Sequence, residues 1–325
     1  GRVMSLSAPV ALWVVAPGEA ALRPATLLEV PDAVTLRARF SGISRGTESL
    51  VFQGRVPPSE WARMRCPFQE GEFPGPVKYG YSLVGQVESG PEQGRWAFAL
   101  HPHQDGCRLP PEAVHWLPEG LPPRRAVLAA NMETAVNALW DAGVRVGDRV
   151  TVVGAGVVGL LVAYLGARIA GTRVSLVDTN PAREALARHL GLTWAGGGAE
   201  PSREADVVFH ASGAPEGLAS ALDCAGFEAR VVELSWYGDR PVTLPLGEAF
   251  HARRLAIRAS QVGHVAGSRR ARWSPGRRLA LALELLRDPA LDQLLEPDWS
   301  FADAPRALAR VCGEPGALCQ VLRYD

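Results

Sequence analysis

Residues 150–159 read VTVVGAGVVG, and an uncharged apolar run continues to residue 167. The β-branched residues at 150–153 predict a buried strand, and Gly154, Gly156 and Gly159 follow it with G-x-G-x-x-G spacing. The first glycine of that pattern permits a tight turn, the second lets the backbone approach a pyrophosphate, and the third lets helix and strand pack closely. The start of the following helix offers free N–H groups to phosphates. This stretch therefore predicts a dinucleotide-binding unit.

A second strand is expected at residues 173–177, and it ends in Asp178, about 20 residues after the glycines. A carboxylate there can accept hydrogen bonds from an adenosine ribose 2′-OH and would repel a 2′-phosphate. The pattern therefore favours NAD(H) over NADP(H). Two alternatives are a glycine-rich turn without a ligand and a membrane span over residues 150–167. That run barely reaches the length of a span, and a span does not explain three glycines.

Length and composition describe the class of protein. The 325 residues suit two domains, and 47% apolar and 21% charged residues with a net charge of +0 are typical of a soluble globular chain. Nothing in this balance calls for nucleic acid or membrane lipid. The N-terminus lacks a signal-peptide pattern, which predicts a cytoplasmic protein. The five cysteines form no C-x-x-C pair, so we expect reduced thiols.

The chain changes character along its length. Up to residue 128 it predicts an irregular β-rich region, with strands at residues 12–15, 34–41, 81–88 and 96–100. A helix is expected at residues 131–142. Strands then alternate with helices, at residues 150–153, 173–177, 206–210, 230–234 and 255–259, with helices such as 181–190 and 216–225 between them. This alternation predicts an α/β fold with a doubly wound parallel sheet. Helices at 277–287 and 304–312 and a strand at 319–324 are expected to return to the first domain.

Several short segments carry a family resemblance. They are SGISRGTE at 41–48, YGYS at 79–82, VGDRV at 146–150 and HASG at 210–213. Together with the domain order they resemble the medium-chain dehydrogenase/reductase superfamily, of the zinc-type alcohol dehydrogenase-like kind, over essentially the whole chain. The segments from Gly54 to Pro58, TNPAR at 179–183 and SGAP at 212–215 resemble its bacteriochlorophyllide dehydrogenase branch. Such enzymes use NAD to oxidise a hydroxyethyl group on a large flat ring.

The resemblance implies a domain organisation. A GroES-like catalytic domain would span residues 1–128 and 264–325, and a Rossmann NAD-binding domain would span residues 129–263. It also implies a homodimer that pairs through the strand near residues 255–259.

The positions of the zinc ligands in this superfamily carry other residues here. Counting from Gly42 places Ser44 at the first cysteine, whereas counting back from Gly54 places Arg45 there. Tyr81 replaces the histidine, and the third ligand falls at or near Ala130. The four-cysteine structural lobe is absent. Zinc needs three or four strong protein ligands, chiefly nitrogen and sulfur donors, and these positions offer none, so we predict an enzyme without a metal.

Without zinc, hydrogen-bond or proton donors must stabilise the charge that develops on the substrate oxygen. Tyr81 is the first candidate, but the ordinary pKa of a phenol is about 10 and would need lowering. Lys78, the single lysine among 34 basic residues, could lower it through its charge. Strand alternation places the two side chains on opposite faces, so a turn at Gly80 would be needed. The alternative is that Tyr79 and Tyr81 are core residues.

Other polar residues complete the predicted catalytic set. Thr47 falls at the relay hydroxyl of the family if the count from Gly54 holds, and Glu48 is expected to brace the loop. His101 and His103 form an H-x-H pair without a third metal donor, so His103 is expected to line the cleft. An ordinary turn or surface role is the alternative for each. The predicted catalytic residues are Tyr81, Thr47, Lys78, Ser44 and His103.

Ligand contacts are predicted from position and from the resemblance. Residues 54–77 form a long proline-rich segment with aromatic side chains, either a lid or a covering loop. Residues after the strand at 230–234 face the crevice of an open α/β sheet. The predicted substrate contacts are Trp61, Phe68, Gln104, Glu133, Trp236 and Tyr237. The predicted cofactor contacts are Gly154, Ala155, Gly156, Val157, Val158, Gly159, Asp178, Arg183, Arg45, Thr134, Ser212 and Gly213.

These observations predict a zinc-independent, NAD(H)-dependent oxidoreductase that interconverts a secondary alcohol and a ketone, on a bulky aromatic or heterocyclic substrate. One alternative is a quinone or enone reductase of the same superfamily, against which Asp178 argues. The other is a nucleotide-binding protein without turnover, against which the retained polar residues argue. The expected partners are a small-molecule substrate and a second copy of the chain, not nucleic acid or membrane.

Overall fold

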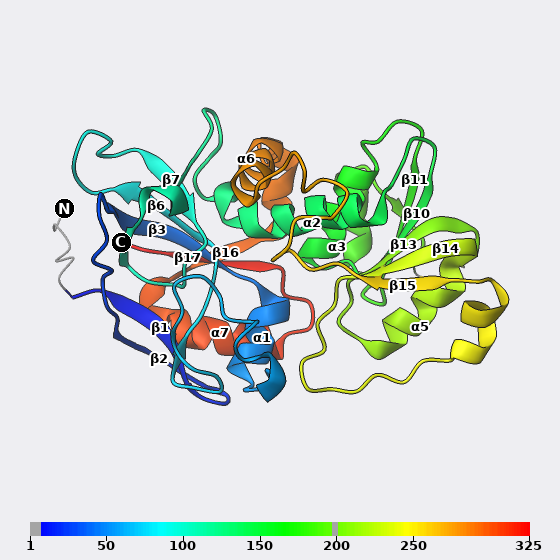
Figure 1. The fold of residues 1–325 in the computed structure, drawn as a ribbon, viewed down its shortest axis with the longest axis horizontal. Coiled ribbons are helices and arrows are strands. Elements are labelled where there is room, and N and C mark those ends of the chain that lie inside the picture. The colour runs from blue at the N-terminus through cyan, green and yellow to red at the C-terminus, as the bar shows by residue number, and fades with distance from the viewer. Residues whose placement is uncertain (1–7, 197–200) are drawn as a thin grey trace. The chain divides into compact units, whose positions relative to one another are not determined.

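The computed structural model describes residues 8–196 and 201–325 (Figure 1). The chain divides into unit 1, which runs to Ala130 and resumes at Leu283, and unit 2, residues 131–282. The first boundary lies two residues from the expected one, whereas unit 1 resumes at 283 and not at 264. The reason lies in two contacts inside unit 2. Asn137 donates a hydrogen bond to the carbonyl oxygen of His264 (2.9 Å), and Arg278 pairs with Glu133 (2.9 Å).

Unit 2 contains a six-stranded sheet in which every pairing is parallel. Its order is β12 (Thr193–Trp194), β11 (Arg173–Val177), β10 (Arg149–Val153), β13 (Ala205–His210), β14 (Ala225–Glu233) and β15 (Ala256–Ala259). The doubly wound α/β prediction is confirmed. Most strands lie within one residue of their expected bounds, but β14 begins five residues early. An irregularity between Ala205 and Val207 lets β13 pair with Ala225, which extends β14.

Helices accompany this sheet. They are α2 (Ala129–Ala142), α3 (Val157–Gly166), α4 (Arg183–His189), α5 (Pro215–Cys224) and α6 (Pro275–Leu285), with the π-helical turn η4 (Leu246–Phe250). The apolar run at 150–167 divides into β10, the glycine turn and α3, because the first half pairs in the sheet and the second is a buried helix. Within residues 8–196 and 201–325, no helix is long and apolar enough to cross a membrane.

Unit 1 is built from two sheets, as the β-rich pattern predicts. One has the order β2 (Glu19–Pro24), β1 (Val10–Ala16), β5 (Val77–Lys78) and β4 (Glu70–Gly71). The other has the order β16 (Leu295–Ser300), β17 (Cys319–Arg323), β3 (Val34–Ile43), β6 (Leu83–Val87), β7 (Trp96–Ala99) and β9 (His115–Trp116), with β8 (Gly106–Leu109) also paired to β3. Because β17 pairs antiparallel with β3, the C-terminal return closes this unit.

Short helices complete unit 1. They are α1 (Arg45–Phe52), α7 (Ala304–Gly313) and the 3-10 turns η1 (Pro58–Glu60), η2 (Pro111–Ala113), η3 (Arg125–Leu128), η5 (Pro289–Leu294) and η6 (Phe301–Asp303). The strand expected at residues 81–88 is shorter, since β6 begins at Leu83. Gly80 has a φ of +146°, a conformation that L side chains rarely adopt, and it interrupts the chain between β5 and β6. Tyr81 therefore lies in the segment between β5 and β6 and not in a strand.

Candidate active site

In the glycine turn of unit 2, two glycines are packed against backbone atoms and one faces open space. Gly154 has a φ of +110°, and a Cβ on it would lie 2.6 Å from the backbone of Ala211. A Cβ on Gly159 would lie only 1.8 Å from the carbonyl oxygen of Gly154. A Cβ on Gly156, by contrast, would meet nothing within 4 Å. The open space therefore lies at Gly156, immediately before α3, where a pyrophosphate could approach the backbone.

Asp178 follows β11 and is fixed beside this turn. Its Oδ2 accepts a hydrogen bond from the backbone N–H of Ala155 (2.7 Å), and its Oδ1 accepts one from the N–H of Asn180 (2.7 Å). Each carboxylate oxygen keeps a further acceptor position. The glycine turn and Asp178 therefore fit a dinucleotide, because the turn can take the pyrophosphate and Asp178 can take a ribose hydroxyl.

The other residues of unit 2 that are predicted to contact ligands follow strands of this sheet or lie in the helices that accompany it. Ser212 and Gly213 follow β13, and Trp236 and Tyr237 follow β14 by a few residues. Val157 and Val158 begin α3, and Arg183 begins α4. Thr134 and Glu133 lie in α2. In open parallel sheets, ligands bind outside the carboxyl ends of the strands. β10, β11, β13 and β14 are neighbours in the sheet, so their carboxyl ends meet at one edge.

Glu133 has a partner that the sequence did not indicate. It is buried and pairs with the Nε of Arg278 (2.9 Å), while Nη2 of Arg278 donates to the carbonyl oxygen of Val262 (2.6 Å). Burial raises the pKa of Glu133, and the positive charge of Arg278 opposes that rise. These contacts join α6, through Arg278, to Glu133 on α2 and to the segment before α6. A substrate contact of Glu133 stays a prediction.

In unit 1, three of the predicted catalytic residues lie together. Ser44 is the N-cap residue of α1, Thr47 lies in its first turn, and the hydroxyl of Tyr81 forms hydrogen bonds with both side chains. Burial raises the pKa of Tyr81 above its ordinary value, and the negative charge of Glu48 raises it further. The expected lowering of this pKa is therefore not found. The phenol is protonated at neutral pH, and although it is a weaker acid than a free phenol it can donate a hydrogen bond to a carbonyl oxygen and a proton to the more basic alkoxide.

A series of buried, hydrogen-bonded polar groups continues from Glu48, next to this cluster. Glu48 Oε1 is 2.6 Å from Nε2 of His103, and Nδ1 of the same ring is 2.8 Å from Oγ of Ser41. Ser41 Oγ is in turn 2.9 Å from the hydroxyl of Tyr324. A Cβ on Gly80 would lie 2.9 Å from the ring of His103, so a glycine is needed there. Glu48 was expected to brace its loop and His103 to line the cleft, whereas His103 is buried here. Ser41 and Tyr324 were missed.

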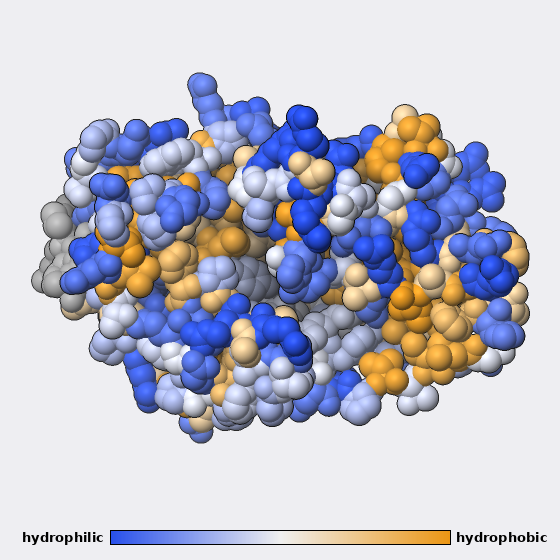
Figure 2. Space-filling model, in the orientation of Figure 1, coloured by the Kyte–Doolittle hydropathy of each residue, from blue (hydrophilic) through white to orange (hydrophobic). Residues whose placement is uncertain are grey.

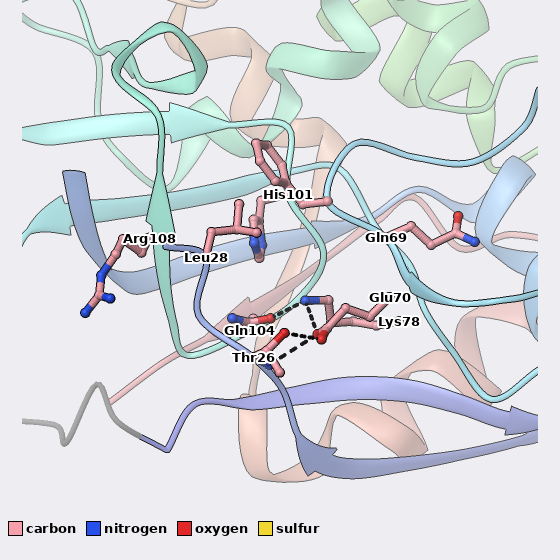
Figure 3. A pocket seen from close by; sticks show the side chains of 9 residues that line it. Thr26, Leu28, Gln69, Glu70, Lys78, His101, Gln104 and Arg108 are labelled. Atoms are coloured by element: carbon pink, nitrogen blue, oxygen red, sulfur yellow. Dashed lines mark hydrogen bonds and ion pairs between the residues drawn. The ribbon is translucent and has the colours of Figure 1, made fainter. Parts of the chain in front are cut away.

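The expected effect of Lys78 on Tyr81 is wrong. The side chain of Lys78 is 3% exposed, and its ammonium group contacts Glu70 Oε2 (2.7 Å) and Gln104 Oε1 (2.7 Å), as Figure 3 shows. The pKa of Tyr81 is raised, which is the opposite of what that role requires. The reason is strand register, because Lys78 pairs with Trp13 on β1 and with Glu70 on β4.

The surroundings of Lys78 form a small cavity of about 80 Å³ (Figure 3). His101 lines it and stacks on Phe68, with ring centroids 5.4 Å apart. Burial lowers the pKa of His101 to about 3, so the ring is neutral, and its Nδ1 is 2.8 Å from the carbonyl oxygen of Pro102. Gln104, expected in the substrate cleft, instead joins Lys78 to the carbonyl oxygen of Gly106 (2.7 Å).

Two further predicted residues have structural partners. The Nε of Arg45 lies 3.2 Å from the carbonyl oxygen of Val311 and 3.1 Å from that of Glu314, at the end of α7. The indole N–H of Trp61 donates to the carbonyl oxygen of Val56 (2.9 Å). These contacts explain how both side chains are held, and their ligand roles stay predictions.

The donor set at the family's zinc positions does not fit zinc. Ser44 offers a hydroxyl that bonds Tyr81, Tyr81 offers a neutral phenol, and Ala130 offers no donor. Zinc in proteins takes thiolate, imidazole or carboxylate ligands. Across the described part of the chain, no three histidine, cysteine, aspartate or glutamate side chains are grouped to hold a metal ion.

Comparison with known sequences gives relatives but no family model that matches. The D-guloside 3-dehydrogenase of Escherichia coli K12 is 25% identical over 328 residues, which cover 88% of this chain and 92% of the relative. A zinc-type alcohol dehydrogenase-like protein of Haemophilus influenzae is 29% identical over 147 residues, which cover 41% of this chain and 42% of the relative.

Solved structures share the fold over nearly the whole chain. L-idonate 5-dehydrogenase of Escherichia coli matches with a TM-score of 0.79 at 15% identity, covering 98% of both chains. A short chain alcohol dehydrogenase of E. coli CFT073, complexed with NADH, has a TM-score of 0.77 at 14% identity, covering 98% and 100%. TarJ of S. aureus, in complex with NADPH, has a TM-score of 0.74 at 13% identity, covering 98% and 99%. The chain is thus similar in sequence to named dehydrogenases, one of them described as zinc-type alcohol dehydrogenase-like, and it shares the fold of solved dehydrogenase structures.

Proposed function

We propose that this chain is an oxidoreductase that interconverts a secondary alcohol and a ketone with a nicotinamide dinucleotide, preferably NAD(H), and without zinc. The observation that carries this proposal is the neutral phenol of Tyr81, bonded to Ser44 and Thr47, at a position where the family holds a zinc ligand. The glycine turn and Asp178 support the cofactor.

The reaction needs a hydride and a proton. A bound nicotinamide would supply the hydride when a ketone is reduced and accept it when an alcohol is oxidised. Tyr81 donates a hydrogen bond to the carbonyl oxygen and then its proton, as charge develops on that oxygen. Burial and Glu48 hold the proton on the phenol until that moment. Ser44 and Thr47 orient the phenol and offer the hydroxyls through which its proton is replaced.

Glu48 needs support to remain a buried carboxylate near Tyr81. An isolated buried charge is costly unless hydrogen bonds compensate it. Glu48 accepts a bond from the backbone N–H of Ser44 and contacts His103, which is itself held by Ser41. We therefore assign these three groups the task of fixing the charge that controls Tyr81.

The substrate class can be narrowed by the relatives. D-guloside 3-dehydrogenase and L-idonate 5-dehydrogenase have names that refer to sugar or sugar-acid dehydrogenation. These names favour a polyol or sugar, whereas the bacteriochlorophyllide-like segments favour a bulky ring-bearing alcohol. Both classes belong in the first assay.

The test is turnover by the purified protein in excess chelator. NAD reduction would be followed with polyols, sugars and aryl secondary alcohols, and NADH oxidation with the matching ketones, quinones and enones. We expect turnover of an alcohol–ketone pair that resists chelation. Activity lost to chelator and restored by zinc would overturn zinc independence. Turnover of quinones or enones alone would overturn the reaction class. NADH binding with no turnover of any substrate would favour the non-catalytic alternative.

We also propose that two copies pair through β15, the edge strand of the six-stranded sheet. Figure 2 shows apolar residues gathered over the part of the molecule that carries β14, β15 and η4. Phe227 and Leu246 are its exposed large apolar side chains, at 65% and 46% exposure. Light scattering of the wild type and of Ile257→Pro, which removes a backbone N–H from this strand, tests the pairing. A monomeric wild type would overturn it.

A further inference from the structure

His210 is the last residue of β13, and its side chain is fully buried. Its Nδ1 lies 2.9 and 3.0 Å from the two carboxylate oxygens of Glu233, the last residue of β14. Its Nε2 lies 2.6 Å from the hydroxyl of Ser212, which is exposed. The imidazole therefore bridges a carboxylate and an exposed hydroxyl at the carboxyl ends of two neighbouring strands.

Glu233 is held from other directions as well. It accepts hydrogen bonds from the backbone N–H of Ser235 (2.7 Å) and from the hydroxyl of Tyr237 (3.0 Å). Burial and the charge of Glu233 raise the pKa of Tyr237, so its phenol remains a donor. Since an ionised carboxylate can only accept, it holds the proton of His210 on Nδ1. The lone pair on Nε2 is then directed at the hydroxyl proton of Ser212.

Two glycines leave room for this arrangement. A Cβ on Gly217 would lie 2.2 Å from Oγ of Ser212 and 2.6 Å from Nε2 of His210. A Cβ on Gly154 would lie 2.6 Å from the backbone nitrogen of Ser212. The bond between His210 and Ser212 is therefore packed directly against the glycine turn.

The hydrogen bonds of Ser212 decide what it can offer a ligand. Its hydroxyl lies 2.6 Å from Nε2 of His210 and 3.4 Å from the carbonyl oxygen of Ala214, so we assign its proton to the shorter bond, and one of its two lone pairs accepts the backbone N–H of Ala214 (3.2 Å). One lone pair remains. Ser212 is thus set to accept a bond from a hydroxyl or amide donor, and it is a poor partner for a phosphate oxygen, which has no proton to give.

We propose that His210, oriented by Glu233, is a positioning residue for the dinucleotide. It fixes the hydroxyl of Ser212 as an acceptor for a hydroxyl or amide group of the cofactor at the edge beside Gly154. This inference rests on the proposed function, which requires a dinucleotide to bind at this edge.

The test is a double-mutant cycle on NADH affinity, measured by fluorescence titration of the full chain. The variants are Ser212→Ala, His210→Leu and the double variant, with Ser220→Ala, an exposed serine of α5, as the matched control. We expect each single change to raise Kd about five- to tenfold, as the loss of one hydrogen bond does. The double variant should lose no more than the singles, because His210 acts through Ser212.

A rescue and a split of the kinetic constants separate positioning from folding. His210→Gln keeps a side-chain amide for hydrogen bonding and should recover most of the affinity that His210→Leu loses. In turnover, Ser212→Ala should raise the KM for the dinucleotide and leave kcat close to wild type. Because Ser212 is exposed, this variant tests the inference even if His210→Leu does not fold.

The outcomes also separate this inference from the proposed function. If the wild type binds NADH and Ser212→Ala binds it equally well, the inference is overturned and the proposed function stands. Losses that add in the double variant would also overturn it, since independent residues add. If the wild type binds neither NADH nor NADPH, the proposed function itself fails.

Discussion

The edge of the parallel sheet in unit 2 and the hydroxyl cluster in unit 1 are built in different ways. The first depends on backbone positions close in sequence, with the glycine turn at 154–159 and Asp178 directly after the next strand. The second unites Ser41, Ser44, His103 and Tyr324, which come from β3, the N-cap of α1, the loop after β7 and the residue after β17. A site defined by the backbone of one β-α unit can be recognised locally, whereas a side-chain network depends on the whole sheet.

The substitution with the largest expected effect is Tyr81→Phe, in the hydroxyl cluster. Removing the phenolic hydroxyl takes away the proposed proton donor but leaves the dinucleotide edge intact. We expect kcat to fall about 10²- to 10⁴-fold, the usual contribution of a positioned acid, with an unchanged Kd for NADH. Tyr79→Phe is the matched control, since Tyr79 is buried and lies 6.2 Å from Tyr81 between ring centroids. An equal loss in the control would assign the effect to packing.

Two alanine substitutions in the glycine turn test the edge of the parallel sheet in unit 2. Gly159→Ala places a Cβ against the backbone of Gly154, so we expect a loss of about 3 kcal/mol in the free energy of unfolding. Gly156→Ala meets open space and should leave stability unchanged while weakening dinucleotide binding. Denaturant unfolding and NADH titration separate the two effects. Unweakened binding by Gly156→Ala would mean that the pyrophosphate lies elsewhere.

We expect His101, in unit 1, to make the free energy of unfolding depend on pH in the acid range. Its folded pKa, about 3, lies below the ordinary value of 6.5, so burial of the neutral ring contributes stability that is complete above pH 6.5. This contribution is lost as the pH falls from 6.5 towards 3, and the loss reaches about 2 kcal/mol at pH 5. We expect His101→Gln to flatten the fall in stability over this range, measured by denaturant unfolding. The exposed His251→Gln is the control, and equal slopes for both variants would contradict the assignment.

The smallest expected effect concerns the choice of dinucleotide. Asp178→Ser removes the charge that would repel a 2′-phosphate, so we expect the ratio of NADPH to NADH Kd values to fall about tenfold. Asp206→Ser is the control, because Asp206 accepts a bond from the N–H of Arg149 and lies toward the other end of the same sheet. Titration with both dinucleotides measures the ratio. An unchanged ratio would show that Asp178 does not contact the ribose.

The parts of the fold that follow from local pattern could be predicted. The strand at 173–177 was expected residue for residue, because a short run with alternating apolar residues between turn signals has few alternatives. The short strands β4 and β5 were missed, since each has only two residues and exists through its partners. The misplaced role of Lys78 has the same origin, because its direction is set by pairing with Trp13 and Glu70 and not by its neighbours in sequence.

The candidate sites follow the same division. The glycine turn and Asp178 could be recognised, whereas His210 and Glu233 were overlooked. A usable signal was present, because both are polar residues that end neighbouring buried strands, and such ends meet at the edge of a parallel sheet. The buried pair of Glu133 and Arg278 had no local signal, since its members come from α2 and α6, on either side of the nucleotide-binding strands.

The single lysine has a practical consequence for labelling chemistry. Its amine is buried and engaged by Glu70 and Gln104, so an acylating dye should find only the α-amino group of the folded chain. Unfolding would release Lys78 as a second and chemically distinct amine. The stoichiometry of dye incorporation, read by intact mass, would then count how many molecules in a sample have opened unit 1, without any engineered reporter.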